Sequence, residues 1–199
     1  MENWLATSPW YGMVLWVILY ISDYYLTIYA SRGFREVGHF QFEGSFELTP
    51  QYQKDIDAHK PISRLHLSLL VLYSLLLLFI WWFTQSFDFI SWAYLVYLGM
   101  FLLVEVAVHF RHLRNIFMIY LIRKEGGVEG EIKYKKQFTY KISAFDLYSM
   151  GVLFLIVALL TYSAFFFGGA IMCIGTGFKH RRLAKKAKSQ SSAAVTTQS

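Results

Sequence analysis

The sequence predicts an all-α membrane protein with about five transmembrane helices and a small cytoplasmic cap that contains β-structure. Of the 199 residues, 56% are hydrophobic, a larger share than in an ordinary soluble domain. These residues occur in blocks of about the 20 residues that a helix needs to cross a bilayer. Lysines and arginines gather beside the blocks, which is the arrangement that the positive-inside rule describes.

The first three spans are predicted at about residues 10–30, 62–83 and 92–110. The second span ends in Trp81 and Trp82, a pair suited to anchoring a helix at the membrane surface. The following connection contains no lysine or arginine, so it is placed on the outer side. The third helix is expected to continue beyond the membrane to about Ile122.

The last apolar run, residues 144–178, is too long for a single span. A single span would also put the basic residues that follow it across the membrane from the basic loop that precedes it. Two spans at about 144–162 and 165–182 place every basic segment on one side. The predicted topology is therefore N-terminus out and C-terminus in, in the cytoplasmic membrane if the source is bacterial. Residues 1–188 form one membrane domain.

The uncharged tail, residues 189–199, contains only Ser, Thr, Gln, Ala and Val and is predicted to be disordered.

Two cytoplasmic loops are predicted, over residues 31–61 and 111–143. Apolar and polar residues alternate around a glycine turn in segment 39–48, and they alternate again in segment 132–142, which follows a glycine-rich turn at 125–130. This period-two pattern predicts a β-hairpin in each loop. The first hairpin carries glutamates and the second carries lysines, so the two are expected to pair into one small sheet over the helix ends. Two separate disordered loops are the alternative.

Three ionisable residues share one face at the end of the third span. Glu105, His109 and His112 follow one another at spacings of four and three, which places them within about 40° on a helix. One carboxylate and two imidazoles suit zinc or iron. Such a site usually takes ligands from a second helix, and the candidates are Asp23, His66 and Asp146. The same residues also suit a proton relay, or a structural role in which Glu105 pairs with an arginine.

Asp23 is an isolated charge inside the first span. A charge at the centre of a transmembrane helix costs about 2.5–3.5 kcal/mol on insertion scales, so an aspartate there needs a partner or water. Tyr20 and Thr27 lie on its helical face, and Arg111 is a candidate ion-pair partner. Asp23 and Glu105 together would suit a proton- or ion-coupled carrier.

Three function classes follow from these patterns. The preferred expectation is a non-enzymatic scaffold or accessory subunit that binds a membrane or cytoplasmic protein partner through the cap. The alternatives are a carrier that uses Asp23 and Glu105, and a metal-dependent membrane enzyme that uses Glu105, His109 and His112. The chain lacks a Gly-x-Ser-x-Gly motif and a multi-histidine hydroxylase set, which weighs against an enzyme. The patterns do not specify a cofactor.

The net charge of +6 comes from residues that flank apolar blocks, so the partner it implies is the bilayer and not nucleic acid. Each basic residue beside a membrane contributes a binding free energy of about 1 kcal/mol through its attraction to anionic lipid headgroups. The residues expected to bind headgroups follow the fifth predicted span: Lys179, Arg181, Arg182, Lys185, Lys186 and Lys188.

Overall fold

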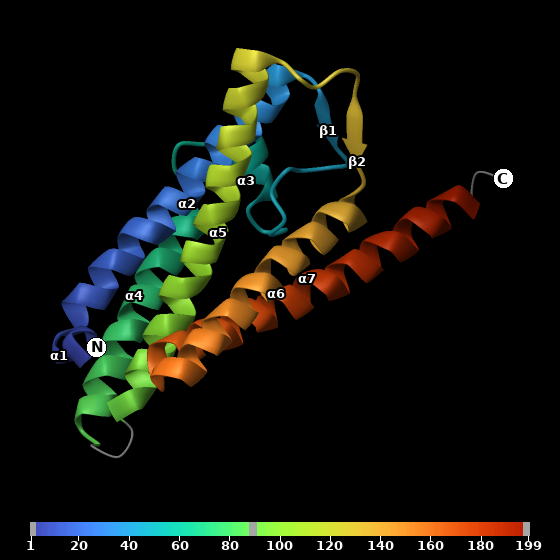
Figure 1. The fold of residues 1–199 in the computed structure, drawn as a ribbon. Coiled ribbons are helices and arrows are strands. Elements are labelled where there is room, and N and C mark those ends of the chain that lie inside the picture. The colour runs from blue at the N-terminus through green and yellow to red at the C-terminus, as the bar shows by residue number, and fades with distance from the viewer. Residues whose placement is uncertain (1–2, 88–90, 197–199) are drawn as a thin grey trace.

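The computed structural model describes residues 3–87 and 91–196. Five long helices within these residues alternate in direction along the chain (Figure 1). They are α2 (Pro9–Val37), α4 (Arg64–Gln85), α5 (Ser91–Glu125), α6 (Lys136–Thr161) and α7 (Ala164–Thr196). The shorter elements are α1 (Asn3–Thr7), β1 (Phe40–Phe42), α3 (Gln53–Asp57) and β2 (Ile132–Tyr134).

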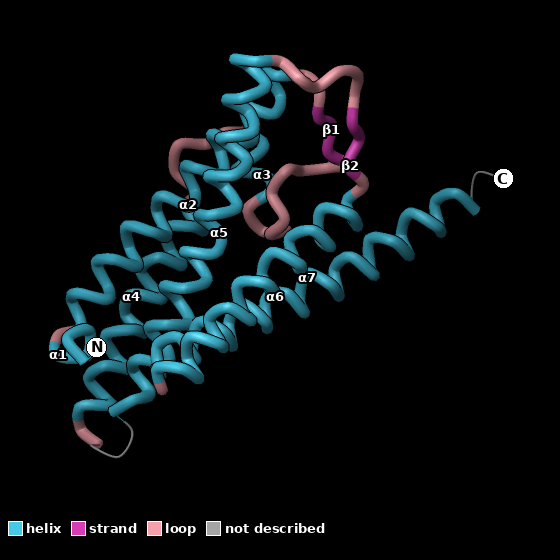
Figure 2. Tube along the Cα trace, viewed as in Figure 1, coloured by secondary structure: helices cyan, strands magenta, loops and turns pink. Residues whose placement is uncertain are grey.

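The long helices form two units that meet at α5. Helices α2, α4 and α5 pack into a bundle, while α6 and α7 form a long antiparallel hairpin (Figure 1). The hairpin is attached mainly by contacts between α5 and α7, because α6 touches α5 only slightly. Strands β1 and β2 lie at one end of the molecule, here called the sheet end, and the turn between α6 and α7 lies at the opposite end (Figure 2).

Local sequence signals fix where these helices begin and end. Ser8 caps α2 by accepting a hydrogen bond from the Trp10 N–H, and the helix ends at Gly38 in a left-handed conformation with φ of 73°. The Ser63 hydroxyl caps α4 by accepting from the His66 N–H. The hairpin turn uses Tyr162 in a left-handed conformation, which a non-glycine residue seldom adopts.

Four helices, α2, α4, α5 and α6, are long and apolar enough to cross a membrane. Helix α4 presents many large apolar side chains outward, among them Leu72, Leu75 and Phe79, as expected of a helix surrounded by lipid. Helix α7 does not meet the same standard. Its apolar part ends at Phe178, about 21 Å from its first residue, whereas the hydrocarbon core is about 30 Å thick. A fifth span at 165–182 therefore stays a prediction.

The predicted pair of hairpins is wrong. Each loop contributes one strand, and the two strands pair in parallel with Phe40 opposite Ile132 and Phe42 opposite Tyr134. Residues 136–142 of the second expected hairpin form the first turns of α6 instead. The loops do join in one sheet, because their alternating aromatic residues pack against Phe34 of α2.

The two helices that extend past the expected membrane boundary differ in how well the sequence predicted them. The extension of α5 is confirmed, since the helix continues to Glu125. The tail was expected to be disordered, but α7 continues as helix to Thr196. Residues 197–199 lie outside the described residues.

Glycines bring α5 and α7 into direct backbone contact. A Cβ atom added to Gly168 of α7 would lie 1.9 Å from the Val96 carbonyl oxygen of α5. A Cβ added to Gly99 of α5 would lie 1.8 Å from the Phe165 carbonyl oxygen of α7. Small residues at such crossings allow membrane helices to approach closely, so these glycines attach the hairpin to the bundle.

Candidate functional site

The strongest candidate site is a polar cluster between α2 and α5. Asp23 of α2 and Glu105 and His109 of α5 each offer a ligand atom, and these three atoms lie within 4.8 Å of one another. All three residues are half-buried. The cluster thus combines two carboxylates and one imidazole from two helices. The helical spacing on α5 predicted that Glu105 and His109 share a face, but it did not show that Asp23 of α2 joins them.

Hydrogen bonds set the tautomer of His109. Its Nδ1 lies 2.7 Å from the backbone carbonyl oxygen of Glu105, and a carbonyl oxygen can only accept a hydrogen bond. The proton therefore belongs on Nδ1, and Nε2 of the neutral ring keeps its lone pair. Nε2 lies 2.6 Å from the Ser22 hydroxyl, whose proton has a second acceptor, the Leu19 carbonyl oxygen at 2.9 Å. If Nε2 of His109 binds another partner, the Ser22 hydroxyl can still donate its proton to the Leu19 carbonyl oxygen.

His112 holds the carboxylate of Asp23. Its Nε2 lies 3.0 Å from Asp23 Oδ1 and 3.1 Å from the Thr27 hydroxyl oxygen. The Thr27 hydroxyl donates to the Asp23 backbone carbonyl, so it accepts from His112 and places the proton on Nε2. Nδ1 of His112 is buried and has no hydrogen-bond partner among the described residues.

Glu105 is incompletely satisfied. Its Oε2 atom is buried and has no hydrogen-bond partner in the described part of the chain. A buried polar atom without a partner is costly, and an isolated buried carboxylate is far more costly. This oxygen needs a proton, a cation or a hydrogen-bond donor such as water close to it.

The structure brings together only some of the residues that the sequence analysis named as candidate ligands. Glu105 and His109 lie close to Asp23 and offer ligand atoms together with it. His112 also contacts Asp23, but it is not one of the three residues that could hold a metal ion. The remaining candidates have other partners. His66 stacks on Tyr20 with ring centroids 4.1 Å apart, and Asp146 forms an ion pair with Arg114 at 3.2 Å. Arg111 does not pair with Asp23, and the Tyr20 hydroxyl bonds Tyr52.

A second polar network, which the sequence did not reveal, links α5, α6 and α7. Arg111 donates to the Ser143 hydroxyl at 2.6 Å, and the same hydroxyl lies 2.9 Å from Nδ1 of His180. Ser143 and His180 are both buried. The three residues lie far apart in the sequence and follow no motif, so only the tertiary structure brings them together.

The six basic residues expected to bind lipid headgroups are all exposed along α7. They are Lys179, Arg181, Arg182, Lys185, Lys186 and Lys188. Their exposure is compatible with the expected contact to anionic headgroups, which stays a prediction.

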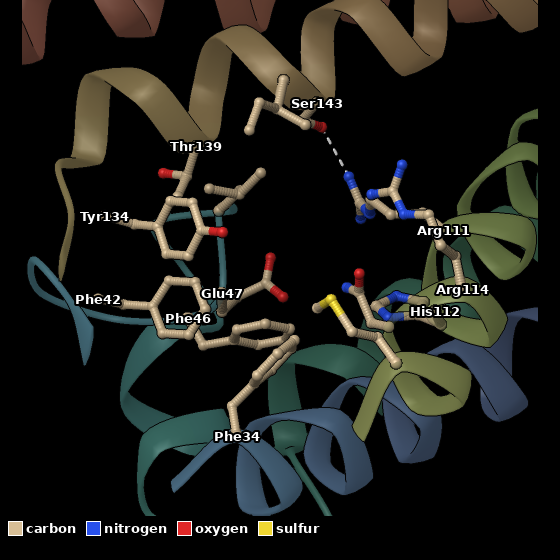
Figure 3. A pocket seen from close by; sticks show the side chains of 14 residues that line it. Phe34, Phe42, Phe46, Glu47, Arg111, His112, Arg114, Tyr134, Thr139 and Ser143 are labelled. Carbon is tan, nitrogen blue, oxygen red and sulfur yellow. Dashed lines mark hydrogen bonds between the residues drawn. The ribbon is translucent and has the colours of Figure 1, made fainter. Parts of the chain in front are cut away.

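A pocket of about 330 Å³ opens beside the polar cluster at the sheet end, and we call it the sheet-end pocket (Figure 3). Its polar lining includes Arg111 and His112 of α5 and Glu47 of the first loop. Burial raises the pKa of the Glu47 carboxyl, although the Thr49 backbone N–H donates to it at 2.6 Å. The apolar lining includes Phe34, Phe42, Phe46 and Tyr134.

No family model, curated protein or solved structure matches this chain, so its function is argued from the geometry alone. The fold is that of a mainly helical protein. Four helices long and apolar enough to span a bilayer are compatible with a multi-pass membrane protein.

Proposed function

We propose that this chain is an integral membrane protein that binds a divalent transition-metal ion, such as zinc or iron, between α2 and α5. The proposed ligands are Asp23, Glu105 and Nε2 of His109. The observation that carries the proposal is the approach of their three ligand atoms to within 4.8 Å of one another. Carboxylate and imidazole ligands are typical of both metals.

Charge balance supports a divalent cation at this place. Two ionised carboxylates and one neutral imidazole carry a charge of −2, so a divalent ion makes the cluster neutral. Isolated charges within a membrane are costly, and mutual neutralisation reduces that cost. The bound ion would also give the unpartnered Oε2 of Glu105 a positive partner.

The neighbours of the proposed ligands have the arrangement found around metal sites. A metal-ligating histidine usually donates its other ring N–H to a carbonyl or carboxylate, and His109 Nδ1 lies 2.7 Å from the Glu105 carbonyl oxygen. His112 orients Asp23 in a similar supporting role. Three protein ligands leave a fourth position for water or a substrate, the pattern of catalytic zinc sites.

Elemental analysis of the purified protein tests the proposal. We expect near-stoichiometric zinc or iron in the wild-type protein, and its loss in His109→Gln and Glu105→Gln. The matched controls are His39→Gln and Glu129→Gln, which change residues outside the cluster and should retain the metal. Metal content that is absent from the wild type, or unaffected by the cluster substitutions, would refute the site.

A proton-coupled carrier is the second candidate, and the unpartnered Oε2 of Glu105 favours it because a protonated carboxyl also satisfies that position. The test is pH-dependent flux in liposomes with wild-type protein and Asp23→Asn. Flux lost in the variant, from protein that contains no metal, would select the carrier. Unchanged flux would remove Asp23 from such a mechanism.

We also propose the topology of five spans with the N-terminus out and the C-terminus in. It is supported by the alternating directions of the five long helices and by the basic residues of α7. Reporter fusions after Ser86 and after Ser199 should lie on opposite sides of the membrane. Two reporters on the same side would contradict the topology. Partner binding through the sheet end stays a prediction, testable by co-purification after mild solubilisation.

A further inference from the structure

The sheet-end pocket has a charge that the fold leaves unpaired. Arg111 is half-buried on its wall, and within the described residues its guanidinium donates a hydrogen bond to the neutral Ser143 hydroxyl. Among the described residues, no carboxylate lies within 4.0 Å of its guanidinium, whereas neighbouring Arg114 is paired with Asp146. A guanidinium has five N–H donors in a fixed plane, so Arg111 retains donors for a carboxylate or phosphate.

A second polar group on the same wall is also unsatisfied. His112 lines the pocket, is only 2% exposed, and has a buried Nδ1 without a hydrogen-bond partner in the described part of the chain. Figure 3 places its ring beside the Arg111 and Arg114 side chains, across the pocket from the aromatic residues. Buried polar atoms are normally bonded, so an unpartnered atom here indicates a place for a polar ligand or water.

The opposite wall is aromatic and closely packed. Phe42 stacks on Tyr134 with ring centroids 5.4 Å apart, and Phe34 lies 5.5 Å from Phe46. These rings contact one another, so they form a continuous apolar wall and not an open cage around a cation. The pocket therefore combines a cationic side with an apolar side.

Glu47 is the one carboxylate that the described residues place on the pocket wall, and an anionic ligand would lie near it. Burial raises the pKa of this carboxyl, and the nearby negative charge of Asp23 raises it further. The Thr49 N–H and the positive charge of Arg111 act in the opposite direction. The protonated form carries no charge and has an O–H to donate, so it is compatible with an anionic ligand.

We propose that the sheet-end pocket binds an anionic amphiphile, with its phosphate or carboxylate headgroup on Arg111 and its apolar chain against the aromatic wall. The volume of about 330 Å³ is within the range of roughly 300–1,000 Å³ that small-molecule sites occupy. The inference rests on the proposed membrane topology, in which a membrane surface beside the helix ends supplies such molecules. The proposal does not depend on the metal site.

Binding of three probes to the purified full-length chain tests the chemistry of the ligand. They are oleoyl lysophosphatidate, monooleoylglycerol, which has the same chain without the charge, and glycerol phosphate, which has the charge without the chain. We expect oleoyl lysophosphatidate to bind at least tenfold more tightly than either of the others. Equal binding of monooleoylglycerol would exclude a role for the charge. Equal binding of glycerol phosphate would identify a soluble anion as the ligand and overturn the amphiphile.

Two variants locate the binding in this pocket. Arg111→Gln should weaken binding of oleoyl lysophosphatidate at least tenfold, whereas Arg64→Gln, a change at an exposed arginine outside the pocket, should not. Asn115→Phe keeps Arg111 but fills the pocket, and it should also abolish binding. Binding retained in both pocket variants, or lost equally in Arg64→Gln, would overturn the proposal. If Arg111→Gln weakens amphiphile binding but keeps the metal content of the wild type, the result concerns the sheet-end pocket and not the metal site.

Discussion

The two faces of α5 are built in opposite ways. Toward α2, the helix presents Glu105, His109 and His112 to the polar side chains of its neighbour, and Oε2 of Glu105 is buried there without a hydrogen-bond partner among the described residues. Toward α7, it presents Gly99, which allows direct backbone contact, and the Arg111–Ser143–His180 network. Close packing and paired polar atoms stabilise a fold, whereas an unsatisfied polar cluster indicates a site that awaits a ligand.

The change from one face to the other occurs between adjacent residues. Arg111 reaches Ser143 of α6, while His112 contacts Asp23 and Thr27 of α2. Successive residues on a helix are about 100° apart, so neighbours in the sequence can serve different interfaces. The comparison predicts that substitutions of Gly168 and Ser143, which pack and pair on the α7 face, affect stability, whereas substitutions of the proposed ligands on the α2 face affect metal binding.

The largest expected effect is that of Gly168→Ala. The added Cβ would overlap the Val96 carbonyl oxygen, and neither backbone can move without separating α5 from α7. Overpacking a core costs about 1–3 kcal/mol and occasionally more, and backbone overlap places this variant at about 3 kcal/mol or above. Thermal unfolding in detergent measures it. Gly175→Ala is the control, since a Cβ there would meet nothing within 4 Å apart from its chain neighbours and its own helix backbone. Equal melting temperatures of the two variants would contradict the contact.

The next effect concerns metal on the α2 face. Adding zinc at about 100 times its Kd should stabilise the wild-type protein by about 2.7 kcal/mol, because a ligand that binds only the folded state stabilises it. Glu105→Gln should lose this stabilisation while its metal-free form remains folded, since the amide removes a buried carboxylate without a partner. The same zinc-induced shift in Glu105→Gln and wild type would argue against the cluster.

A smaller loss of stability is expected from Ser143→Ala on the α7 face. The substitution leaves the buried Nδ1 of His180 and one Arg111 N–H without their shared partner, at a cost of about 1–3 kcal/mol. Chemical or thermal unfolding gives the value, and the metal content should not change. Ser149→Ala, at an exposed position of the same helix, serves as the control. Loss of metal in Ser143→Ala would show that the two faces are coupled.

The smallest effect is the pH dependence that Glu47 contributes. Burial raises the pKa of this carboxyl in the folded state above its ordinary value of 4.5, so the folded state binds the proton more tightly than the unfolded state does. Its contribution to stability is therefore present at low pH and decreases as pH rises above 4.5. Glu47→Gln should lose less stability than the wild type between pH 4.5 and pH 8. Parallel stability–pH curves would show that Glu47 is not responsible.

The sequence alone determined the mainly helical class of the fold and the shared face of Glu105, His109 and His112. Apolar block length and helical spacing depend on residues close together in the chain, and these local properties place the long helices and one side of the polar cluster. Local patterns did not predict the structure of the loops correctly. Alternation there predicted two hairpins, because period two specifies a strand but not its partner.

Only the tertiary structure decided which distant residues meet. It placed Asp23 beside His109 and His112, joined Phe40 to Ile132 in a parallel strand pair, and brought Ser143 between Arg111 and His180. These contacts depend on how whole helices pack, through close approaches such as that of Gly168 to Val96. Packing is set by the combined fit of many side chains, so no single spacing in the sequence encodes it.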